Sequence, residues 1–358
     1  MTEVAVVGAG INGLATAFFL RARGVETVVL ERSGVGAGAS GVQPGGVRQQ
    51  WGTRVNCLLA RESHTFYRGL DERLGRRSGA RLDPCGYLFL AHRGETLAEL
   101  RAHVALQNEL GIASSILTPD AIAELVPGLD ATTALGASWN GEDGYVDRPQ
   151  AVVEAFAADA NVEIADVQRL RREHDAWRIE TTAGTTRARA VIVAAGWETR
   201  ALVDAPLPIA PEARHLYLSE PIRERLLEPL VVAADLHLAA KQLANGRVLA
   251  SDLGATDTAD ATWRGRLTEL LPILSYVTYP VLASGVYDLT PDRQPIVGEV
   301  DDGLWVAAGF SGHGFMLAPA IGMRLAAAVA GEPHDDLLEP FAPERFARGD
   351  LEPERRLV

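Results

Sequence analysis

The sequence predicts an α/β protein that combines a Rossmann-type dinucleotide-binding fold with a second, mostly antiparallel β-sheet. Three observations support this fold class. A glycine-rich turn joins an apolar run to a helical pattern at the N-terminus. A similar glycine-rich turn precedes a helical pattern near the C-terminus. Between them lie short β-rich runs separated by turn residues, which are typical of antiparallel sheets.

The first elements form a strand, a glycine turn and a helix. Residues 4–7 are an apolar run of the length expected for a buried parallel strand. Gly8, Gly10 and Gly13 then complete the pattern G-x-G-x-x-G, and residues 14–23 have helical spacing. In such a motif Gly8 permits the tight turn, Gly10 lets the backbone approach a pyrophosphate, and Gly13 lets the helix pack closely on the strand.

A second buried strand is predicted over residues 27–30, with Glu31 at its C-terminal end. An acidic residue there accepts hydrogen bonds from a ribose 2'-hydroxyl but repels a 2'-phosphate, which disfavours NADP. Strand, helix and acidic residue occur together at the expected spacing. They predict dinucleotide binding rather than a merely structural glycine turn, although the motif does not separate FAD from NAD.

The stretch that follows, residues 32–51, is long and rich in glycine and serine. Such a stretch must lie against another part of the structure to be ordered. It begins at the end of the ribose-binding strand, so the cofactor is its nearest expected neighbour. A solvated loop is the alternative.

The middle of the chain predicts the second sheet and a return to the first fold. Strands over residues 86–91 and 134–140 flank a helix over 95–110, and residues 207–220, 230–243 and 247–254 add further strands. A helix and a short strand within 144–164 precede a β-hairpin that turns near Ala183 and Gly184. A buried strand over 190–194 follows this hairpin.

The stretch "GFSGHGFMLAPA", residues 309–320, is a second glycine-rich turn before a helix. Free N–H groups at a helix N-terminus attract electron-rich groups. The pattern therefore predicts a second contact with a ligand. An ordinary start of a helix, with His313 as a solvated turn residue, is the alternative.

Several of these stretches resemble the glycine oxidase, sarcosine oxidase and D-amino-acid oxidase family of flavoproteins, and the match extends along the whole chain. The matching segments are "ERSGVGAGASG", "AVIVAAGWETRAL", "TPDRQPIVG" and "AAGFSGHGFMLAPAIG". The resemblance implies an FAD-dependent oxidoreductase that oxidises the C–N bond of a small amino acid or amine. It also implies that residues 290–298 form a strand leading to the catalytic face.

The resemblance implies which residues surround FAD. The first glycine loop would hold the pyrophosphate, Val167 would lie by the adenine, and the second loop would lie beside the isoalloxazine ring. The family's flavin-linking cysteine would fall near Gly285, so FAD is expected to be non-covalent. The expected FAD-binding residues are Gly8, Gly10, Ile11, Asn12, Gly13, Glu31, Arg32, Ala39, Ser40, Gly46, Val47, Val167, Ala195, Gly196, Trp197, Gly312, His313, Gly314, Phe315 and Met316.

The resemblance also suggests substrate residues. In "GGVRQQWG", Arg48 aligns with an arginine that binds the substrate carboxylate in sarcosine oxidases, and a guanidinium can pair with both carboxylate oxygens. A structural ion pair is the alternative role for Arg48. Tyr287 stands where glycine oxidases have a carboxylate-binding arginine, and Met316 where sarcosine oxidases have a lysine. His313 could contact the flavin edge.

The electron acceptor is expected to be oxygen or another carrier. Sarcosine oxidases place a lysine over the flavin just after a hairpin turn, and here Val248 matches that position. This difference favours a dehydrogenase over an oxidase. A different strand register would instead bring Lys241 to the flavin. "GGVRQQW" also resembles the β-subunits of amino-acid dehydrogenase complexes such as proline dehydrogenase, so a subunit of a complex is an alternative, as is an amine oxidase of specialised metabolism.

Composition excludes several classes of partner. The formal net charge of −13 argues against nucleic acids and anionic membranes. No apolar run approaches the 18 or more residues of a membrane span. Cys57 and Cys85 are the only cysteines, which gives no disulfide framework or metal pair and fits a cytoplasmic protein. Homo- or hetero-oligomers remain possible.

The expected domains are discontinuous. Residues 1–82, 143–205 and 283–358 are predicted to form the FAD-binding domain. Residues 83–142 and 206–282 are predicted to form the substrate-binding domain that covers the flavin.

Overall fold

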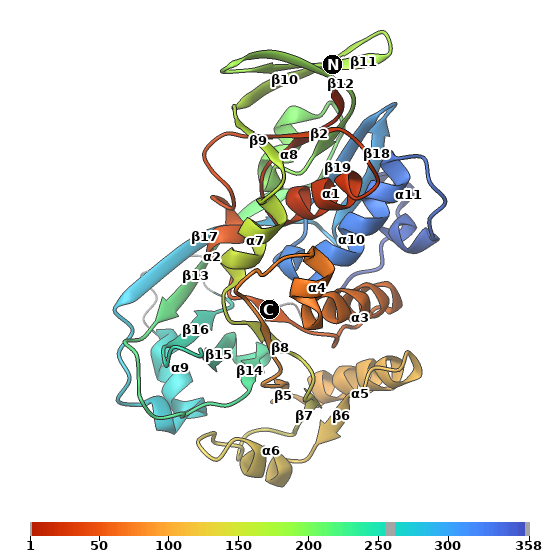
Figure 1. Cartoon of the computed structure of the whole chain (residues 1–358). Coiled ribbons are helices and arrows are strands. Elements are labelled where there is room, and N and C mark those ends of the chain that lie inside the picture. The colour runs from red at the N-terminus through yellow and green to blue at the C-terminus, as the bar shows by residue number, and fades with distance from the viewer. Residues whose placement is uncertain (1, 255–261, 355–358) are drawn as a thin grey trace.

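The computed structural model describes residues 2–254 and 262–354. Within them the chain forms two eight-stranded sheets and one three-stranded sheet, with helices packed around and between them (Figure 1). The predicted α/β fold class is confirmed. The small sheet comprises β3 (Gly46–Val47), β4 (Leu82–Asp83) and β8 (Gly144–Val146).

The first sheet contains the predicted dinucleotide-binding elements. Its strands are β1 (Thr2–Val7), β2 (Thr27–Glu31), β9 (Asn161–Ile164), β10 (Val167–Glu173), β11 (Ala176–Thr181), β12 (Gly184–Val193), β18 (Ile296–Asp301) and β19 (Leu304–Ala308). β1 pairs in parallel with both β12 and β2, so it lies in the middle of the sheet. Its last four residues are buried, which explains their unbroken apolar sequence.

The hairpin between β11 and β12 differs from expectation in one respect. The turn at Ala183 and Gly184 is confirmed. However, β12 runs without interruption from Gly184 to Val193, so the predicted hairpin arm and the predicted buried strand are one element. A second hairpin joins β10 to β11 through His174, whose φ is 53°.

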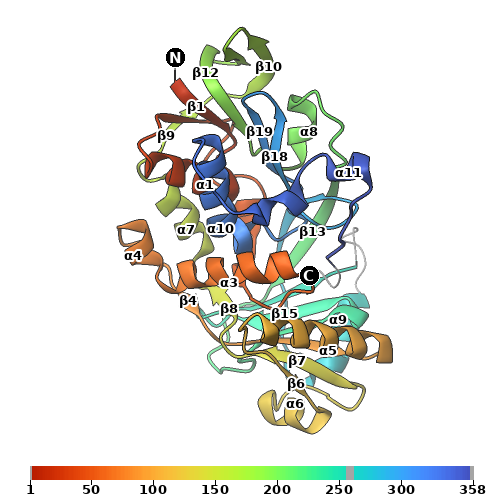
Figure 2. The same ribbon diagram turned by 90° about the vertical axis from the view of Figure 1, so that its right-hand side faces the viewer.

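The helices of the described residues are α1 (Ile11–Arg21), α2 (Ala39–Val42), α3 (Arg54–Arg68), α4 (Leu70–Leu74), α5 (Gly94–Glu109), α6 (Pro119–Leu125), α7 (Pro149–Ala157), α8 (Thr199–Leu202), α9 (Thr262–Leu270), α10 (Gly314–Val329) and α11 (Arg345–Arg348). Helices α1, α7 and α10 pack near the first sheet, whereas α5, α6 and α9 contact the second (Figure 1). Short 3₁₀ turns cover Gly196–Glu198, Ala234–Leu236, Pro272–Leu274 and Asp336–Phe341. In both overall views α3 lies between α10 and α5 (Figures 1 and 2).

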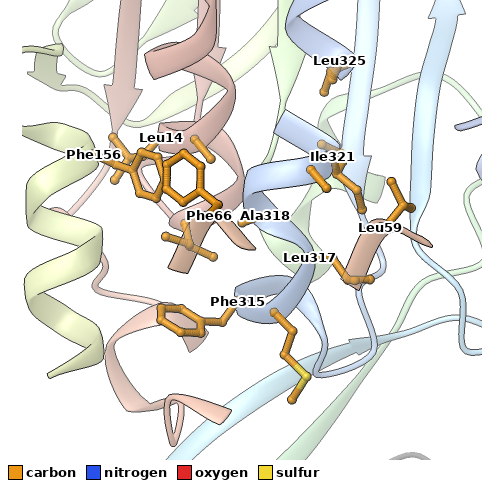
Figure 3. Packing of buried hydrophobic residues seen from close by; sticks show 14 of the residues in the cluster. Leu14, Leu59, Phe66, Phe156, Phe315, Leu317, Ala318, Ile321 and Leu325 are labelled. Carbon is orange, nitrogen blue, oxygen red and sulfur yellow. The ribbon is translucent and has the colours of Figure 1, made fainter. Parts of the chain in front are cut away.

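Helix α10 occupies the centre of the main hydrophobic core. It is apolar on nearly all sides, as expected for a helix with no solvent-facing surface. Its residues Leu317 and Ile321 belong to the same cluster of buried residues as Leu14 of α1 and Leu59 of α3 (Figure 3). A Cβ at Gly322 would lie 3.0 Å from the carbonyl carbon of Ala15, so glycine permits the close packing of α10 on α1.

The second sheet is mostly antiparallel, as predicted. Its strand order is β17-β13-β16-β15-β14-β5-β7-β6, and the pairing of β14 with β5 is parallel. The parallel pair occurs where two separate segments of the chain meet, one before residue 142 and one after residue 206. The bounds are β5 (Tyr87–Ala91), β6 (Ser115–Leu117), β7 (Gly136–Asn140), β13 (Ala210–Leu218), β14 (Leu230–Ala233), β15 (Leu238–Gln242), β16 (Val248–Asp252) and β17 (Val281–Leu289).

Two expectations about the C-terminal third need correction. β17 pairs with β13 along its whole length, so residues 283–289 belong to the second sheet. Residues 290–295 are a buried turn rather than a strand, and β18 begins only at Ile296. The turn is held by an ion pair of 2.7 Å between Asp292 and Arg345, both almost fully buried. The division into two domains stays a prediction.

Among the described residues, no helix combines the length and apolar character needed to cross a membrane. Within the same ranges, no group of three or more His, Cys, Asp or Glu side chains is arranged to hold a metal ion.

Candidate active site

A cavity of about 660 Å³ extends from the C-terminal ends of β1 and β2 to strands β15, β16 and β17. It brings together both glycine loops, which are about 300 residues apart in the sequence. The predicted residues that line it are Gly8, Gly10, Ile11, Asn12, Glu31, Arg32, Ala39, Ser40, Gly46, Val167, Ala195, Gly196, Trp197, Lys241, Tyr287, Gly312, Gly314, Phe315 and Met316. Four predicted residues lie outside the lining: Gly13, Val47, Arg48 and His313.

The first glycine loop has no room for side chains. Gly8 has a φ of 104°, and a Cβ there would lie 2.5 Å from the carbonyl oxygen of Ala194. A Cβ at Gly13 would lie 2.3 Å from the carbonyl oxygen of Gly8, which explains why Gly13 contributes to packing rather than to the cavity wall. The loop therefore exposes backbone at the N-terminus of α1, as a phosphate site requires.

The glycine- and serine-rich stretch after β2 folds back on this loop. The backbone N–H of Gly36 donates to the carbonyl oxygen of Ala9 at 2.9 Å. The Ser40 hydroxyl oxygen accepts a hydrogen bond of 3.0 Å from the N–H of Ile11 at the start of α1. The alternative of a solvated loop is therefore wrong, because the stretch forms one wall of the cavity.

Glu31 is fixed at the end of β2. One carboxylate oxygen accepts from the N–H of Ala9 at 2.8 Å, and the other accepts from the N–H of Ser33 at 2.9 Å. Each carboxylate oxygen can accept more than one hydrogen bond, so a ribose hydroxyl in the cavity could still be bound. Nearby, Arg32 forms an ion pair of 2.6 Å with Glu198, at the same end of the cavity as Val167.

The second glycine loop is organised by Asp288, which the sequence did not single out. The Asp288 carboxylate accepts from the N–H of Gly309 at 2.8 Å, and its backbone carbonyl accepts from the N–H of Ser311 at 3.1 Å. Burial raises the pKa of Asp288 to about 6. Gly312 has a φ of 90°, and a Cβ there would lie 2.4 Å from the ring of Tyr287.

The two glycine loops meet at Asn12. A Cβ at Gly314, the first residue of α10, would lie 2.6 Å from the amide nitrogen of the Asn12 side chain. The side-chain oxygen of Asn12 is buried and has no hydrogen-bond partner among the described residues. Two helix N-termini, those of α1 and α10, thus border one cavity, and a buried polar atom without a partner lies in the residue between them. These features fit a long cofactor with a phosphate group and an electron-rich ring.

His313 is buried and does not line the cavity. It is 0% exposed, so the alternative of a solvated turn residue is wrong, and the expected contact of His313 with the flavin edge stays a prediction. Its ring lies edge-on to Trp51, with ring centres 4.5 Å apart, and neither ring nitrogen has a partner among the described residues. Burial, together with the positive charge of Arg48, holds the pKa of His313 well below its usual range, so the ring is neutral.

Lys241, and not Val248, points toward the cavity from the hairpin of β15 and β16. Lys241 pairs with Leu249, and both line the cavity, whereas Val248 is 0% exposed within a hydrophobic cluster. The expectation that Val248 occupies the position of the oxygen-reactive lysine is therefore wrong. Successive residues of a strand face opposite sides, so an error of one residue in alignment exchanges the faces.

The ammonium group of Lys241 is deeply buried. It donates a hydrogen bond to the carbonyl oxygen of Pro44 and lies 3.9 Å from the ring centre of Tyr145. Burial lowers the pKa of Lys241 to about 7. Because Pro44 belongs to the wall formed by residues 32–51, Lys241 connects the second sheet to the cofactor-facing loop.

Arg48 is enclosed by aromatic rings. Its guanidinium carbon lies 4.4 Å from the ring centre of Trp51, 5.1 Å from that of Phe89 and 5.9 Å from that of Tyr87. Among the described residues no carboxylate forms an ion pair with Arg48, and its Nε and Nη1 atoms have no partner. Tyr87 lines the large cavity, so the arginine lies behind this ring.

The end of the cavity near Tyr287 is largely apolar. Tyr287 lies beneath Arg214, whose guanidinium carbon is 5.6 Å from the ring centre, and burial raises the pKa of the Tyr287 hydroxyl. The charged residues among the described lining at this end are Lys241 and Asp288. The apolar lining residues at this end include Leu216, Leu230, Leu249, Leu253, Phe310 and Met316.

Asp143 is a second residue that sequence reasoning missed. It is 0% exposed and accepts a hydrogen bond of 2.8 Å from the N–H of Gln49, next to Arg48. Burial raises the pKa of Asp143 to about 7. Its sequence context, "NGEDGYV", indicates only a turn, so no local signal distinguishes this carboxylate from a solvated one.

Comparisons with known proteins agree with this geometry. Residues 3–328 match the family model described as DAO, FAD dependent oxidoreductase. The glycine oxidase of Geobacillus kaustophilus is 28% identical, over 95% of this chain and 96% of that protein. The sarcosine oxidase subunit beta of Rhodobacter capsulatus is 26% identical, over 98% of this chain and 89% of that subunit.

Solved structures show the same similarity. The crystal structure of L-proline dehydrogenase from P. horikoshii superimposes with a TM-score of 0.89 at 27% identity, and the match covers 98% of this chain and 99% of that one. The crystal structure of the Geobacillus kaustophilus glycine oxidase gives a TM-score of 0.86 at 27% identity, with coverage of 96% and 98%.

Proposed function

This chain belongs to the DAO family of FAD-dependent oxidoreductases, and we propose that it oxidises the C–N bond of a small amino acid or amine. Sarcosine, proline and glycine-like compounds are the leading substrates, as the names of its relatives suggest. The observation that carries the proposal is the single cavity that joins a dinucleotide loop to a largely apolar pocket. When bound, FAD accepts a hydride equivalent from the carbon beside the substrate nitrogen.

The chain would hold FAD through both glycine loops. Backbone at Gly10 and the N-terminus of α1 would bind the pyrophosphate, and Glu31 would accept from the ribose. Val167 would lie by the adenine. The N-terminus of α10, at Gly314, would stabilise negative charge on the ring. Binding would be non-covalent, and neither of the two cysteines lines the cavity.

The substrate would bind between the second sheet and the flavin. Its apolar walls exclude water and hold the reacting carbon in place. Lys241 lines the cavity and is one candidate to bind a substrate carboxylate; the predicted anchor, Arg48, lies behind Tyr87 and would reach the carboxylate only if that ring moved aside. Arg48 offers two unpaired guanidinium donors, and Lys241 offers a point charge whose lowered pKa makes it partly neutral near pH 7.

Anaerobic reduction of bound flavin tests this proposal. Purified protein saturated with FAD is mixed without oxygen with sarcosine, proline and glycine, and with dimethylamine, pyrrolidine and methylamine as matched compounds without the carboxylate. We expect the flavin absorbance to bleach with at least one carboxylated compound. Protein that binds no FAD, or bound flavin that no member of the panel reduces, contradicts the proposal.

The electron acceptor would be oxygen or another carrier. Because Lys241 lies in the cavity wall, it is the residue to substitute in a test of the reaction with oxygen. Val248, whose apolar side chain would have favoured slow reaction with oxygen, faces the core and not the cavity. Stopped-flow mixing of reduced enzyme with oxygenated buffer distinguishes the cases. Rapid reoxidation that is lost in Lys241→Met identifies an oxidase, whereas slow reoxidation in the wild type identifies a dehydrogenase that needs a dye or quinone.

A second candidate function is that of a flavoprotein subunit within a larger complex. β17 is the last strand of its sheet, and it exposes Val281, Leu282 and Val286 by 41%, 47% and 39%. The similarity to a sarcosine oxidase subunit beta points the same way. Steady-state turnover by the isolated chain with an artificial acceptor would contradict an obligatory complex.

The cavity also supports a third candidate, an amine oxidase of specialised metabolism, because no arginine lines its substrate end among the described residues. Faster flavin bleaching by pyrrolidine than by proline would favour it. We further propose a cytoplasmic location, which fits the free state of Cys57 and Cys85.

A further inference from the structure

The C-terminal segment contains a buried glutamate outside the large cavity. Glu354 is 3% exposed, although Leu351 and Glu352 beside it are exposed. Its carboxylate accepts hydrogen bonds from the N–H of Gly52 at 2.8 Å, from the N–H and hydroxyl of Thr53 at 3.2 and 3.0 Å, and from the side-chain amide of Asn56 at 2.8 Å. A charge is retained in such a place only where partners satisfy it.

These partners surround the N-terminus of α3. The helix has no acidic residue in its first turn, and its N-cap residue, Thr53, makes no side-chain capping bond. A negative charge at a helix N-terminus is favourable because it meets the positive end of the helix dipole. The tail therefore supplies α3 with a charge that its own sequence lacks.

Gly52 and Thr53, which donate hydrogen bonds to Glu354, directly follow the turn that contains Arg48. The indole N–H of Trp51 donates to the carbonyl oxygen of Arg48 at 3.2 Å, and the Trp51 ring contacts both the Arg48 guanidinium and His313. The Trp51 carbonyl accepts from the side-chain amide of Gln107 at 2.8 Å. Any movement of Gly52 would thus be transmitted to Trp51 and to the two side chains that pack on it.

A small second cavity lies between the tail and Arg48. It has a volume of about 20 Å³, enough for one water molecule, and its lining includes Arg48, Gln107 and Glu354. Arg48 and Glu354 are a buried cation and a buried anion without an ion-pair partner among the described residues. Both side chains line this one small cavity, together with Trp51 and Phe89.

The position of the tail is itself determined by a buried network. The N–H of Glu354 donates to the carbonyl oxygen of Asp292 at 3.0 Å, and Asp292 is ion-paired with Arg345. Gln294 donates to the carbonyl oxygen of Glu352 at 3.2 Å and accepts from Asn56 at 2.9 Å. The turn after β17 and the start of α3 therefore hold the tail from two sides.

We propose that Glu354 is a positioning residue that holds the Arg48–Trp51 turn in place through the N-terminus of α3. The chain would use its C-terminal tail to close the back of the active site. The kinetic part of this proposal rests on the proposed function, because it requires a substrate. The structural part does not rest on the proposed function, because it concerns only whether Glu354 keeps the start of α3 and the preceding turn in place.

Labelling of Cys57 tests the structural part without substrate. Cys57 is 0% exposed in the first turn of α3, and its thiol donates to the carbonyl oxygen of Trp51 at 3.5 Å. The FAD-loaded protein is treated with iodoacetamide, and the tryptic peptide of residues 55–61 is followed by mass spectrometry. We expect Glu354→Ala to label about tenfold faster than the matched tail variant Glu352→Ala, because hydrogen bonds to a charged acceptor are lost. Equal rates in the two variants would overturn the proposal.

Kinetics test the positioning role. We expect Glu354→Ala to raise the KM of the best carboxylated substrate about tenfold, with little change in the dissociation constant of FAD, since Glu354 lies outside the FAD cavity. A chain ending at Asp350 should behave like Glu354→Ala, and Glu354→Gln should be intermediate. A lower melting temperature with unchanged KM would show a purely structural residue and reject the role. If no substrate is found, the proposed function fails, and the labelling result still decides whether Glu354 orders the turn.

Discussion

The two ends of the large cavity are built in different ways. At the nucleotide end, Gly8, Gly10 and Glu31 lie within one unit of two strands joined by a turn and a helix. At the substrate end, Lys241 and Tyr287 come from separate strands of the second sheet. The first end is therefore determined by local geometry. The second depends on strand register and on contacts between distant segments.

The largest effect is expected at the nucleotide end, from Gly8→Ala. The new Cβ would lie 2.5 Å from a backbone oxygen, in a residue whose φ is 104°, so the turn cannot keep its shape. We expect a loss on the order of 3 kcal/mol in stability, together with loss of FAD binding. Thermal unfolding and FAD titration measure both. Gly34→Ala is the control, because no atom lies within 4 Å of its added Cβ; equal behaviour of the two variants would contradict the rigid-turn argument.

Glu31→Ala should have the next largest effect. A ribose hydroxyl would lose its charged acceptor, which weakens FAD binding by about 1.5–3 kcal/mol. Equilibrium titration of apoprotein with FAD measures the change. Glu26→Ala, an exposed glutamate just before the same strand, is the control. Unchanged affinity in Glu31→Ala would show that the ribose is held by another residue.

Arg48→Lys examines the substrate end. A point charge replaces a planar group that stacks between Trp51 and Phe89. We expect kcat/KM for proline or sarcosine to fall about tenfold, or about 1.4 kcal/mol, while pyrrolidine or dimethylamine is spared. The same measurement on Lys241→Met decides between the two candidate anchors. Equal losses with and without the carboxylate in Arg48→Lys would show that Arg48 supports the fold or the flavin instead.

Lys241→Met is the variant for which we expect a gain in stability rather than a loss, and this gain should depend on pH. Burial lowers the pKa of Lys241 to about 7, from 10.5 in the unfolded chain. Between these values the unfolded chain binds the proton and the folded chain does not, so the destabilisation caused by this group decreases as pH rises. Below pH 7 the buried charge carries its full cost. The variant should therefore gain a few degrees in melting temperature at pH 6, and the gain should shrink toward pH 9. A difference independent of pH would refute the lowered pKa.

The comparison between the two ends explains which sequence predictions succeeded. Strand β1, its glycine turn and Glu31 follow from local rules, because backbone sterics and helix N-termini act within about 25 residues. The antiparallel character of the second sheet was also predictable from short β-rich runs. The register between β15 and β16 was not predictable, because both faces of this hairpin carry apolar residues and the sequence pattern does not show which face is buried.

Residues whose place depends on distant segments were the ones that sequence could not assign. His313 looks like a turn residue, but Trp51 covers it, and Asp288 gains its role only because the second glycine loop folds onto β17. In the sequence Glu354 belongs to a charged tail, yet its carboxylate is buried at the start of α3, where it accepts four hydrogen bonds.

Local chemistry therefore determined that a dinucleotide binds and how the nucleotide end of the cavity is built, because glycine conformation, helix dipoles and one acidic residue suffice there, whereas the choice of FAD came from the resemblance to a family. Tertiary structure alone decided that Lys241 lines the cavity and that Arg48 lies behind Tyr87. The reason is physical: the direction of a strand residue depends on its pairing register, and the pKa of a buried ammonium depends on the atoms that exclude water from it.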